Sequence, residues 1–347
     1  MLYWANGVSI ILILNMNKKA FEVQFNWLFV LVAGTAILLF FTVVVVKQKS
    51  VAETSTKATV LKSIEAIMTG ASVSTDTINI VDIPNSNIEV SCGRISLGGV
   101  SKQYQSLILF APSLVKGNKL ITQTLAFNAP YRATNLLYIT SPQLRYVIIG
   151  NNNLAKEINK SLPVELKKEF YTTMPEIKNS NNYKVRFIVF EDMIDFPKSL
   201  EKMPDSDVTA IKINGDSEKG TIEFWQKDST SWLAKGSSNY IGKASLIGAI
   251  YADTLDLYEC NMQNVFSKLN LVAKIYIERT KNLVQKSISS RQVQCNQFYN
   301  NALTHLNNIH SASSNFNMEN VNAIADAANS LANENKNSQI YSCTLIY

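Results

Sequence analysis

The stretch WLFVLVAGTAILLFFTVVVV, residues Trp27–Val46, holds 20 residues and no charged side chain. As an α-helix it would be about 30 Å long, which is the thickness of the hydrocarbon core of a bilayer. Trp27 belongs to the residue types that favour a membrane interface. A helix that is apolar on every side over this length is rare in a soluble core. The sequence therefore predicts a single-pass transmembrane helix over residues 27–46, with the lipid bilayer as a partner.

Residues 1–26 precede this helix as an N-terminal leader. The apolar stretch Val8–Leu14 is too short to cross a membrane. Met16 follows it and opens the segment MNKKAFEVQFNWLF, so we expect the true start at Met16, with residues 1–15 as an upstream extension. The alternative is a cleaved signal peptide, for which no clear small-x-small cleavage site follows the apolar stretch.

The segment Met16–Gly34 resembles the N-terminus of type IV pilin-like proteins with class III signal peptides, where a short basic leader is cut before a hydrophobic helix. Here Lys18-Lys19-Ala20 ends the leader. The resemblance implies a processing site between Ala20 and Phe21 and a surface subunit as the product. Glu22 would be the second mature residue, whereas the family often has glutamate fifth. FNWLFVLVAG also resembles the anchor of archaeal single-pass proteins that carry no assigned activity.

An amphipathic stalk helix is expected over residues 47–70. Its apolar residues recur at the spacing i, i+1, i+4, i+7 and i+8, which places them on one face of a helix. They are Val60, Leu61, Ile64, Ile67 and Met68. Gly70 is a plausible end of the helix.

Residues 71–240 are expected to form an α+β region with mostly antiparallel strands, because the apolar period changes towards 2. One strand–helix–strand unit at 145–190 could be parallel. A first helix over 154–161 and a second over 164–171 are expected inside it. The expected strands are 77–83, 88–92, 106–110, 120–127, 136–139, 145–149, 184–190, 208–214 and 221–226.

Residues 241–347 are expected to form a helical hairpin or bundle with an extended tail. The apolar pattern predicts helices over 243–286, 291–310 and 318–333. The tail, 338–347, is expected to be extended. The predicted fold class is therefore α+β, with a transmembrane helix, its amphipathic extension, an α+β middle and a helical end.

Four cysteines are spread along the chain: Cys92, Cys260, Cys295 and Cys343. None lies in a CxxC or CxxH pair, and only two histidines, His305 and His310, occur, which leaves little for a zinc site. An even number of separated cysteines beside a membrane anchor favours two disulfides in an oxidising compartment. We therefore expect the C-terminal domain to lie outside the cytoplasm. The alternative is four reduced, buried cysteines.

The expected helix lengths favour one disulfide pairing. If the first two C-terminal helices are antiparallel, Cys260 lies about 30 Å from Cys295, which is too far for a disulfide. The third helix returns towards the start of the second, and the tail then easily reaches Cys295. We therefore favour Cys92–Cys260 and Cys295–Cys343, with the other two connectivities left open.

Candidate chemistry is sparse. The net charge of +6 is spread thinly and no nucleic-acid motif is present, so neither a nucleic-acid partner nor a cofactor is expected. Glu191, Asp192 and Asp195 follow an expected strand and could hold a cation such as Ca²⁺, although a helix cap or a solvated loop explains them equally well. No metal site is predicted. The aromatic residues Trp225, Trp232 and Tyr240 pack in the core or form a binding face.

The leading hypothesis is a membrane-anchored extracytoplasmic structural or interaction protein that could contact other membrane or surface proteins. No catalytic constellation is visible, so an enzyme is the less favoured reading. The alternative is an anchored enzyme or ligand-binding receptor whose site has no linear motif. A deep polar pocket with converging titratable groups would favour this alternative, and a shallow surface would favour assembly.

Overall fold

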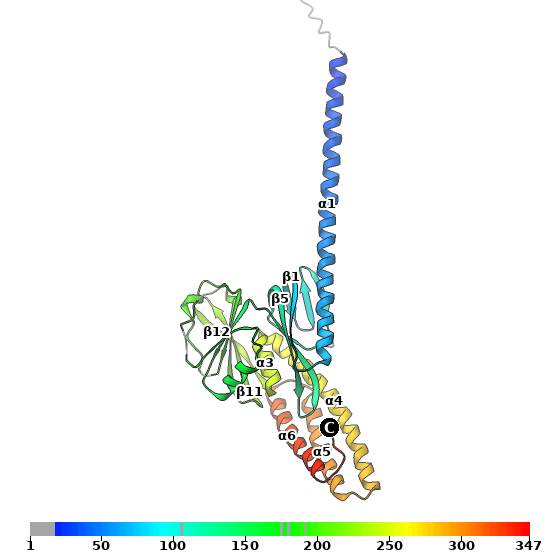
Figure 1. Ribbon diagram of the computed structural model, residues 1–347, viewed down its shortest axis with the longest axis vertical. Helices are drawn as coiled ribbons and strands as arrows, with labels where there is room; N and C mark the ends of the chain where they lie inside the picture. The colour runs from blue at the N-terminus through cyan, green and yellow to red at the C-terminus, as the bar shows by residue number, and fades with distance from the viewer. Residues whose placement is uncertain (1–17, 105–106, 174–175, 179–180, 191) are drawn as a thin grey trace, which may run out of the picture. The chain divides into compact units, whose positions relative to one another are not determined.

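A computed structural model describes residues 18–104, 107–173, 176–178, 181–190 and 192–347 (Figure 1). The chain divides into two compact units between Thr56 and Lys57. Helix α1 (Lys18–Val73) supplies the described part of the first unit and the beginning of the second. The expected start at Met16 and most of the leader lie outside the described residues.

The first unit contains the apolar stretch that the sequence singles out. Most of its side chains are exposed, with Trp27 at 69% and Phe29 at 74%. Among the described residues, this is the one helix long and apolar enough to cross a membrane, and none of its most apolar window is buried. The prediction of one long apolar N-terminal helix is therefore confirmed, and insertion in a membrane stays a prediction. Ala20 and Phe21 lie within α1.

In the second unit, the end of α1 covers one face of a six-stranded sheet, here called sheet A. Val60, Leu61, Ile64 and Met68 are buried there, and Ile67 is half-buried. The apolar stripe is thus a packing surface, and residues from Lys57 onward belong to the second compact unit. The helix ends at Val73 rather than at Gly70.

Sheet A has the strand order β3-β2-β1-β5-β6-β4. All its pairings are antiparallel except that of β4 with β6. Strand β1 is a single strand with one bulge in its pairing to β5, whereas the sequence predicts two separate strands there, 77–83 and 88–92. The strands are β1 (Ile78–Ser91), β2 (Arg94–Leu97), β3 (Val100–Gln103), β4 (Leu109–Phe110), β5 (Leu114–Asn128) and β6 (Arg132–Thr140).

A second six-stranded sheet, sheet B, has the order β12-β11-β10-β9-β7-β8. Four neighbouring strands are parallel, from β10 through β9 and β7 to the edge strand β8. The parallel part of sheet B therefore extends beyond the single strand–helix–strand unit that the sequence predicts at 145–190. Over both sheets, six of the ten described strand pairings are antiparallel. The strands are β7 (Leu144–Ile149), β8 (Lys167–Tyr171), β9 (Lys184–Val189), β10 (Val208–Gly215), β11 (Lys219–Asp228) and β12 (Ser231–Ile241).

Short helices connect these strands: α2 (Asn153–Ser161) after β7, and the 3-10 turns Lys198–Leu200 and Asp205–Asp207 before β10. The expected second helix over 164–171 is wrong, because β8 occupies its end. Strand β8 pairs with β7, and Arg145 of β7 holds Glu169 of β8 through two hydrogen bonds, Nε–Oε1 at 2.8 Å and Nη2–Oε2 at 2.6 Å. Tertiary pairing thus overrides a locally helical composition.

The Arg145–Glu169 pair makes the stability of the domain depend on pH. Hydrogen bonds from Arg145, and then from Tyr171, hold the pKa of Glu169 below its usual value of 4.5. Because the folded-state pKa is the lower one, the pair stabilises the fold fully above the unfolded-state value and loses this contribution as pH falls through the folded-state pKa. We expect the melting temperature to fall less between pH 7 and about pH 3 in Glu169→Gln than in the wild type. Identical profiles would contradict a role for the pair.

The C-terminal third is helical, as predicted, but its first helix is interrupted. Helix α3 (Gly242–Tyr251) ends before Ala252, and α4 (Leu255–Ser289) starts after Thr254, whose side chain accepts a hydrogen bond from the Leu257 N–H. The single helix expected over 243–286 is therefore wrong at this point. The remaining helices are α5 (Val293–Ala312) and α6 (Met318–Ile340).

Helix α3 is almost wholly buried in the largest hydrophobic core, which both sheets and the later helices share. From sheet A, the Tyr138 hydroxyl donates to Ala244 O at 2.7 Å. From sheet B, Arg186 Nη2 donates to Ala249 O at 2.9 Å. Helix α3 therefore joins the two sheets.

Helices α4, α5 and α6 lie side by side (Figure 1). Helix α6 is longer than the expected 318–333, and the extended tail accordingly begins later than expected. The tail packs along the helices: the Tyr347 ring lies 5.8 Å from that of Tyr131 and 6.2 Å from that of Tyr276. Asn335 Oδ1 accepts the Ile346 N–H at 2.8 Å, which fixes the tail to α6.

Candidate functional site

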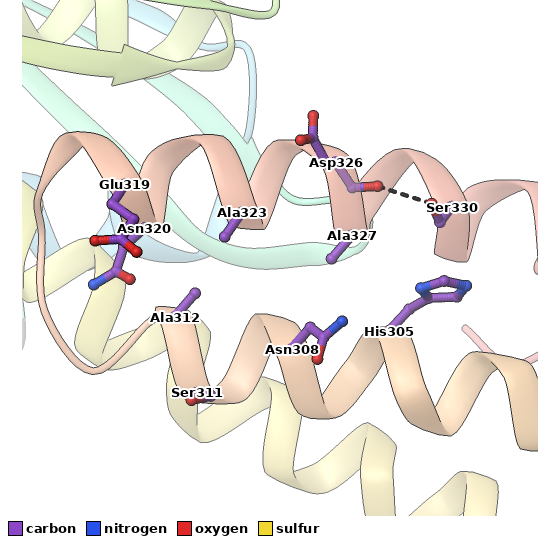
Figure 2. A pocket seen from close by; sticks show the side chains of 10 residues that line it. All are labelled: His305, Asn308, Ser311, Ala312, Glu319, Asn320, Ala323, Asp326, Ala327 and Ser330. Carbon is purple, nitrogen blue, oxygen red and sulfur yellow. Dashed lines mark hydrogen bonds between the residues drawn. The ribbon is translucent and has the colours of Figure 1, made fainter.

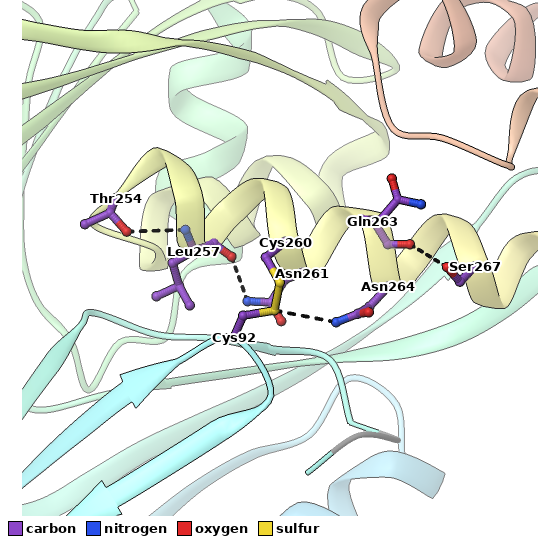
Figure 3. Close-up of a disulfide and its surroundings, with 8 residues drawn as sticks. All are labelled: Cys92, Thr254, Leu257, Cys260, Asn261, Gln263, Asn264 and Ser267. Atoms are coloured by element: carbon purple, nitrogen blue, oxygen red, sulfur yellow. Dashed lines mark hydrogen bonds between the residues drawn. A yellow bond between two sulfur atoms is a disulfide. The ribbon is translucent and has the colours of Figure 1, made fainter. Parts of the chain in front are cut away.

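The four cysteines form two pairs at disulfide distance. Cys92, in the turn between β1 and β2, bonds to Cys260 of α4 with a Cα–Cα distance of 6.0 Å (Figure 3). Cys295 of α5 bonds to Cys343 of the tail with a Cα–Cα distance of 5.7 Å. These are the pairings that the expected helix lengths favour. The first joins sheet A to α4, and the second holds the tail on α5.

The two bridges differ in exposure. Cys295 and Cys343 are 6% and 9% exposed, whereas Cys260 is exposed and Cys92 is half-buried. Asn264, one helical turn beyond Cys260, points its amide at Cys92 Sγ at 3.8 Å (Figure 3). A soluble reductant can therefore reach the Cys92–Cys260 bridge more readily than the other.

A buried cluster of ionisable groups lies where the two sheets meet the break between α3 and α4. The side chains of Lys184, from β9, and Asp253 form an ion pair, and each is 3% exposed. Ser113, before β5, donates to Asp253 from its N–H and from its hydroxyl, both at 2.8 Å. The carboxylate of Asp253 thus ties sheet A and sheet B to the helical region.

Arg186, two residues after Lys184 on β9, completes this cluster. Its guanidinium donates to the carbonyls of Ala249 and Ala252 at the end of α3 and lies 5.6 Å from the centre of the Phe224 ring. A cation there complements the negative end of the helix dipole. Burial lowers the pKa of Arg186 to about 10, so the group stays charged at neutral pH. Because Lys184, Arg186 and Asp253 are almost wholly buried and hold one another or backbone groups of other elements, we interpret them as structural.

The acidic residues that were candidate cation ligands are not assembled into a site in the described part of the chain. Asp192 is fully exposed, with Oδ1 3.8 Å from Lys212 Nζ, and Asp195 is exposed. Glu191 lies outside the described residues. Among the residues that the structure describes, no group of three or more His, Cys, Asp and Glu side chains could hold a metal ion.

Of the three aromatic candidates in sheet B, Tyr240 is fully buried, and Trp225 and Trp232 are half-buried. The Trp232 ring lies 5.6 Å from Phe187 and 5.1 Å from Phe196, and Trp225 packs against the same cluster. This arrangement supports core packing over an exposed aromatic binding face.

An open groove lies between α5 and α6, with a volume of about 540 Å³ (Figure 2). We call it the α5–α6 groove. Small side chains leave the space, because Ala312 lies on α5 and Ala323 and Ala327 lie one turn apart on α6. Its remaining lining is polar: His305, Asn308, Ser311, Glu319, Asn320, Asp326 and Ser330.

The charge of the α5–α6 groove is negative. Glu319 and Asp326 are both exposed, and His305 is the one ionisable residue of basic type that lines it. Asp326 Oδ1 also lies 3.1 Å from Lys219 Nζ of β11, which offsets part of this charge. An exposed groove with a narrow apolar floor and polar walls can hold side chains of another macromolecule, but it does not enclose a small substrate.

No protein-family model matches the chain, and no curated protein or solved structure is significantly similar to it.

Two features have no functional motif but leave a local signal in the sequence: the α5–α6 groove and the start of α4. Ala323 and Ala327 are spaced i, i+4 on one helix face, which is the spacing of a shallow groove between helices. Thr254 followed by Asp256 is an N-cap with an acidic first turn, and it marks the start of α4. That Asp253 would meet Lys184 and Ser113 has no local signal, since these residues are 69 and 140 positions away.

Proposed function

We propose that this chain is a single-pass membrane protein whose domain from Lys57 to Tyr347 lies outside the cytoplasm as a structural or interaction module. The observation that carries the proposal is the pairing of all four cysteines in a domain that continues from an apolar helix. Structural disulfides persist mainly in oxidising compartments. The open α5–α6 groove and the enclosure of Lys184, Arg186 and Asp253 in the core favour an interaction module over an enzyme.

Topology is the first test. Protease added to intact cells that carry the protein should degrade the domain without permeabilisation, whereas a cytoplasmic marker protein should survive. Alkaline carbonate extraction should leave the uncleaved chain in the membrane pellet, as expected for a helix of this apolarity. Protection of the domain until the cells are permeabilised would place it in the cytoplasm and overturn the proposal.

The finer proposal is a pilin-like surface subunit that is processed before its apolar helix. It rests on the basic leader Lys18-Lys19-Ala20 and the apolar helix that follows Phe21. We expect N-terminal sequencing of the mature protein to begin at or near Phe21. An intact Met1 or Met16 would remove this support and leave only the membrane anchor.

A further inference from the structure

Two exposed surfaces of the helical region are complementary to each other. The first is the outer face of α4, here called the α4 face, and consists of Lys268, Leu271, Lys274, Ile275, Glu278 and Lys281. Leu271 and Ile275 form its apolar centre, one turn apart, and are 57% and 60% exposed. The second surface is the α5–α6 groove, which has an alanine floor.

The charges of the two surfaces have opposite signs. The α4 face carries three lysines and one glutamate, and Glu278 is already paired with Lys281 at 2.8 Å. Lys268 and Lys274 flank the apolar centre. The α5–α6 groove presents Glu319 beside its floor, where Ala323 is exposed, whereas the Asp326 carboxylate points away from α5 and pairs with Lys219 of β11 (Figure 2). Opposite charges around an apolar contact favour association and fix its register.

We propose that the α4 face of one copy of this chain docks into the α5–α6 groove of a second copy. Leu271 and Ile275 fill the space above Ala323 and Ala327, while one of the flanking lysines, Lys268 or Lys274, approaches Glu319. The proposal rests on the proposed function, because it specifies the partner of an interaction module. Leu271, Ile275 and Ala323 are exposed within one copy, so neither surface covers the other there.

Such an interface is heterologous, since the two copies use different surfaces. In a pair of copies joined this way, one copy still has a free α4 face and the other a free groove. Further copies can therefore add until a ring closes or an open chain forms. This property separates the proposal from a symmetric dimer, in which both copies use the same surface.

The test uses two full-length variants in detergent, each with one surface blocked. Leu271→Asp combined with Ile275→Asp blocks the α4 face, and Ala323→Trp fills the groove at an exposed position. Val164→Asp and Asn322→Trp are matched controls, because both residues are exposed and lie outside the two surfaces. Sedimentation velocity measures the assembly of each protein alone and of the two blocked variants mixed.

We expect the wild type and both controls to form species larger than a dimer. Each blocked variant alone should associate at least about tenfold more weakly. The mixture should form a dimer and stop there, because each variant supplies the surface that the other lacks. This rescue also shows that both variants are folded.

The proposal is overturned if the wild type stays monomeric, if the blocked variants assemble like the wild type, or if the mixture forms no dimer while both variants melt like the wild type. Assembly is measured on the purified chain and does not depend on protease access in cells. A cytoplasmic domain would therefore overturn the proposed function and leave this interface standing.

Discussion

Replacing Asp253 with alanine should lower the free energy of unfolding by about 3–5 kcal/mol, because it leaves the buried Lys184 ammonium without its counter-ion. Lys184 is 3% exposed and cannot recover solvation without opening the core. The N–H and hydroxyl of Ser113 would lose their acceptor as well. Urea unfolding of the full-length chain in detergent, followed by circular dichroism, measures the change.

A matched control is Glu278→Ala. It also removes a carboxylate that is paired with a lysine, Lys281 on α4, but this pair is exposed. We expect little measurable change there, since exposed pairs contribute little. The double variant Lys184→Met, Asp253→Leu should recover much of the loss, because it removes the unpaired charge along with its partner. If Asp253→Ala unfolds like the wild type, Lys184 is not held in the core by this ion pair.

Removing either disulfide should destabilise the domain by about 2–5 kcal/mol, and the Cys92–Cys260 bridge should matter more. Its cysteines are 168 residues apart, against 48 for Cys295–Cys343. Closing the longer loop removes more conformational entropy from the unfolded chain. The difference between the two loops corresponds to about 1 kcal/mol of stability. Unfolding of Cys92→Ala, Cys260→Ala beside Cys295→Ala, Cys343→Ala measures the difference.

Peptide mapping under non-reducing conditions provides the control for both disulfide variants. It should show one remaining linked peptide in each variant, joining Cys295 to Cys343 or Cys92 to Cys260. Graded addition of a thiol reductant to the wild type should open the Cys92–Cys260 bridge first, because Cys260 is exposed. A peptide linking Cys260 to Cys295 would contradict the antiparallel packing of α4 and α5.

Periodic and strongly apolar segments are the parts of this fold that the sequence predicts well. Helix α1, α2, α5 and the start of α6 carry long apolar runs, apolar stripes or capping residues, and these signals depend only on neighbouring residues. The helix lengths then limited which cysteines could meet, so the favoured disulfide pairing is the one that the structure contains.

Edge strands were missed for a physical reason. Strand β12 is mostly exposed along its first half and contains Gly236, so it lacks the alternation of a half-buried strand. Strand β8 has a charged, helix-favouring composition and becomes a strand because β7 offers it backbone partners. A local pattern cannot report a partner that lies elsewhere in the chain.

The sequence by itself determined the apolar helix over Trp27–Val46, the amphipathic segment after it and the number of possible disulfides, because these follow from runs, periods and counts. Only the tertiary structure decided that the expected long helix is interrupted at Asp253, which binds Ser113 and Lys184, and that Ala323 and Ala327 open a groove beside α5. The reason is that both features depend on contacts between distant segments, whose free energy no single segment encodes.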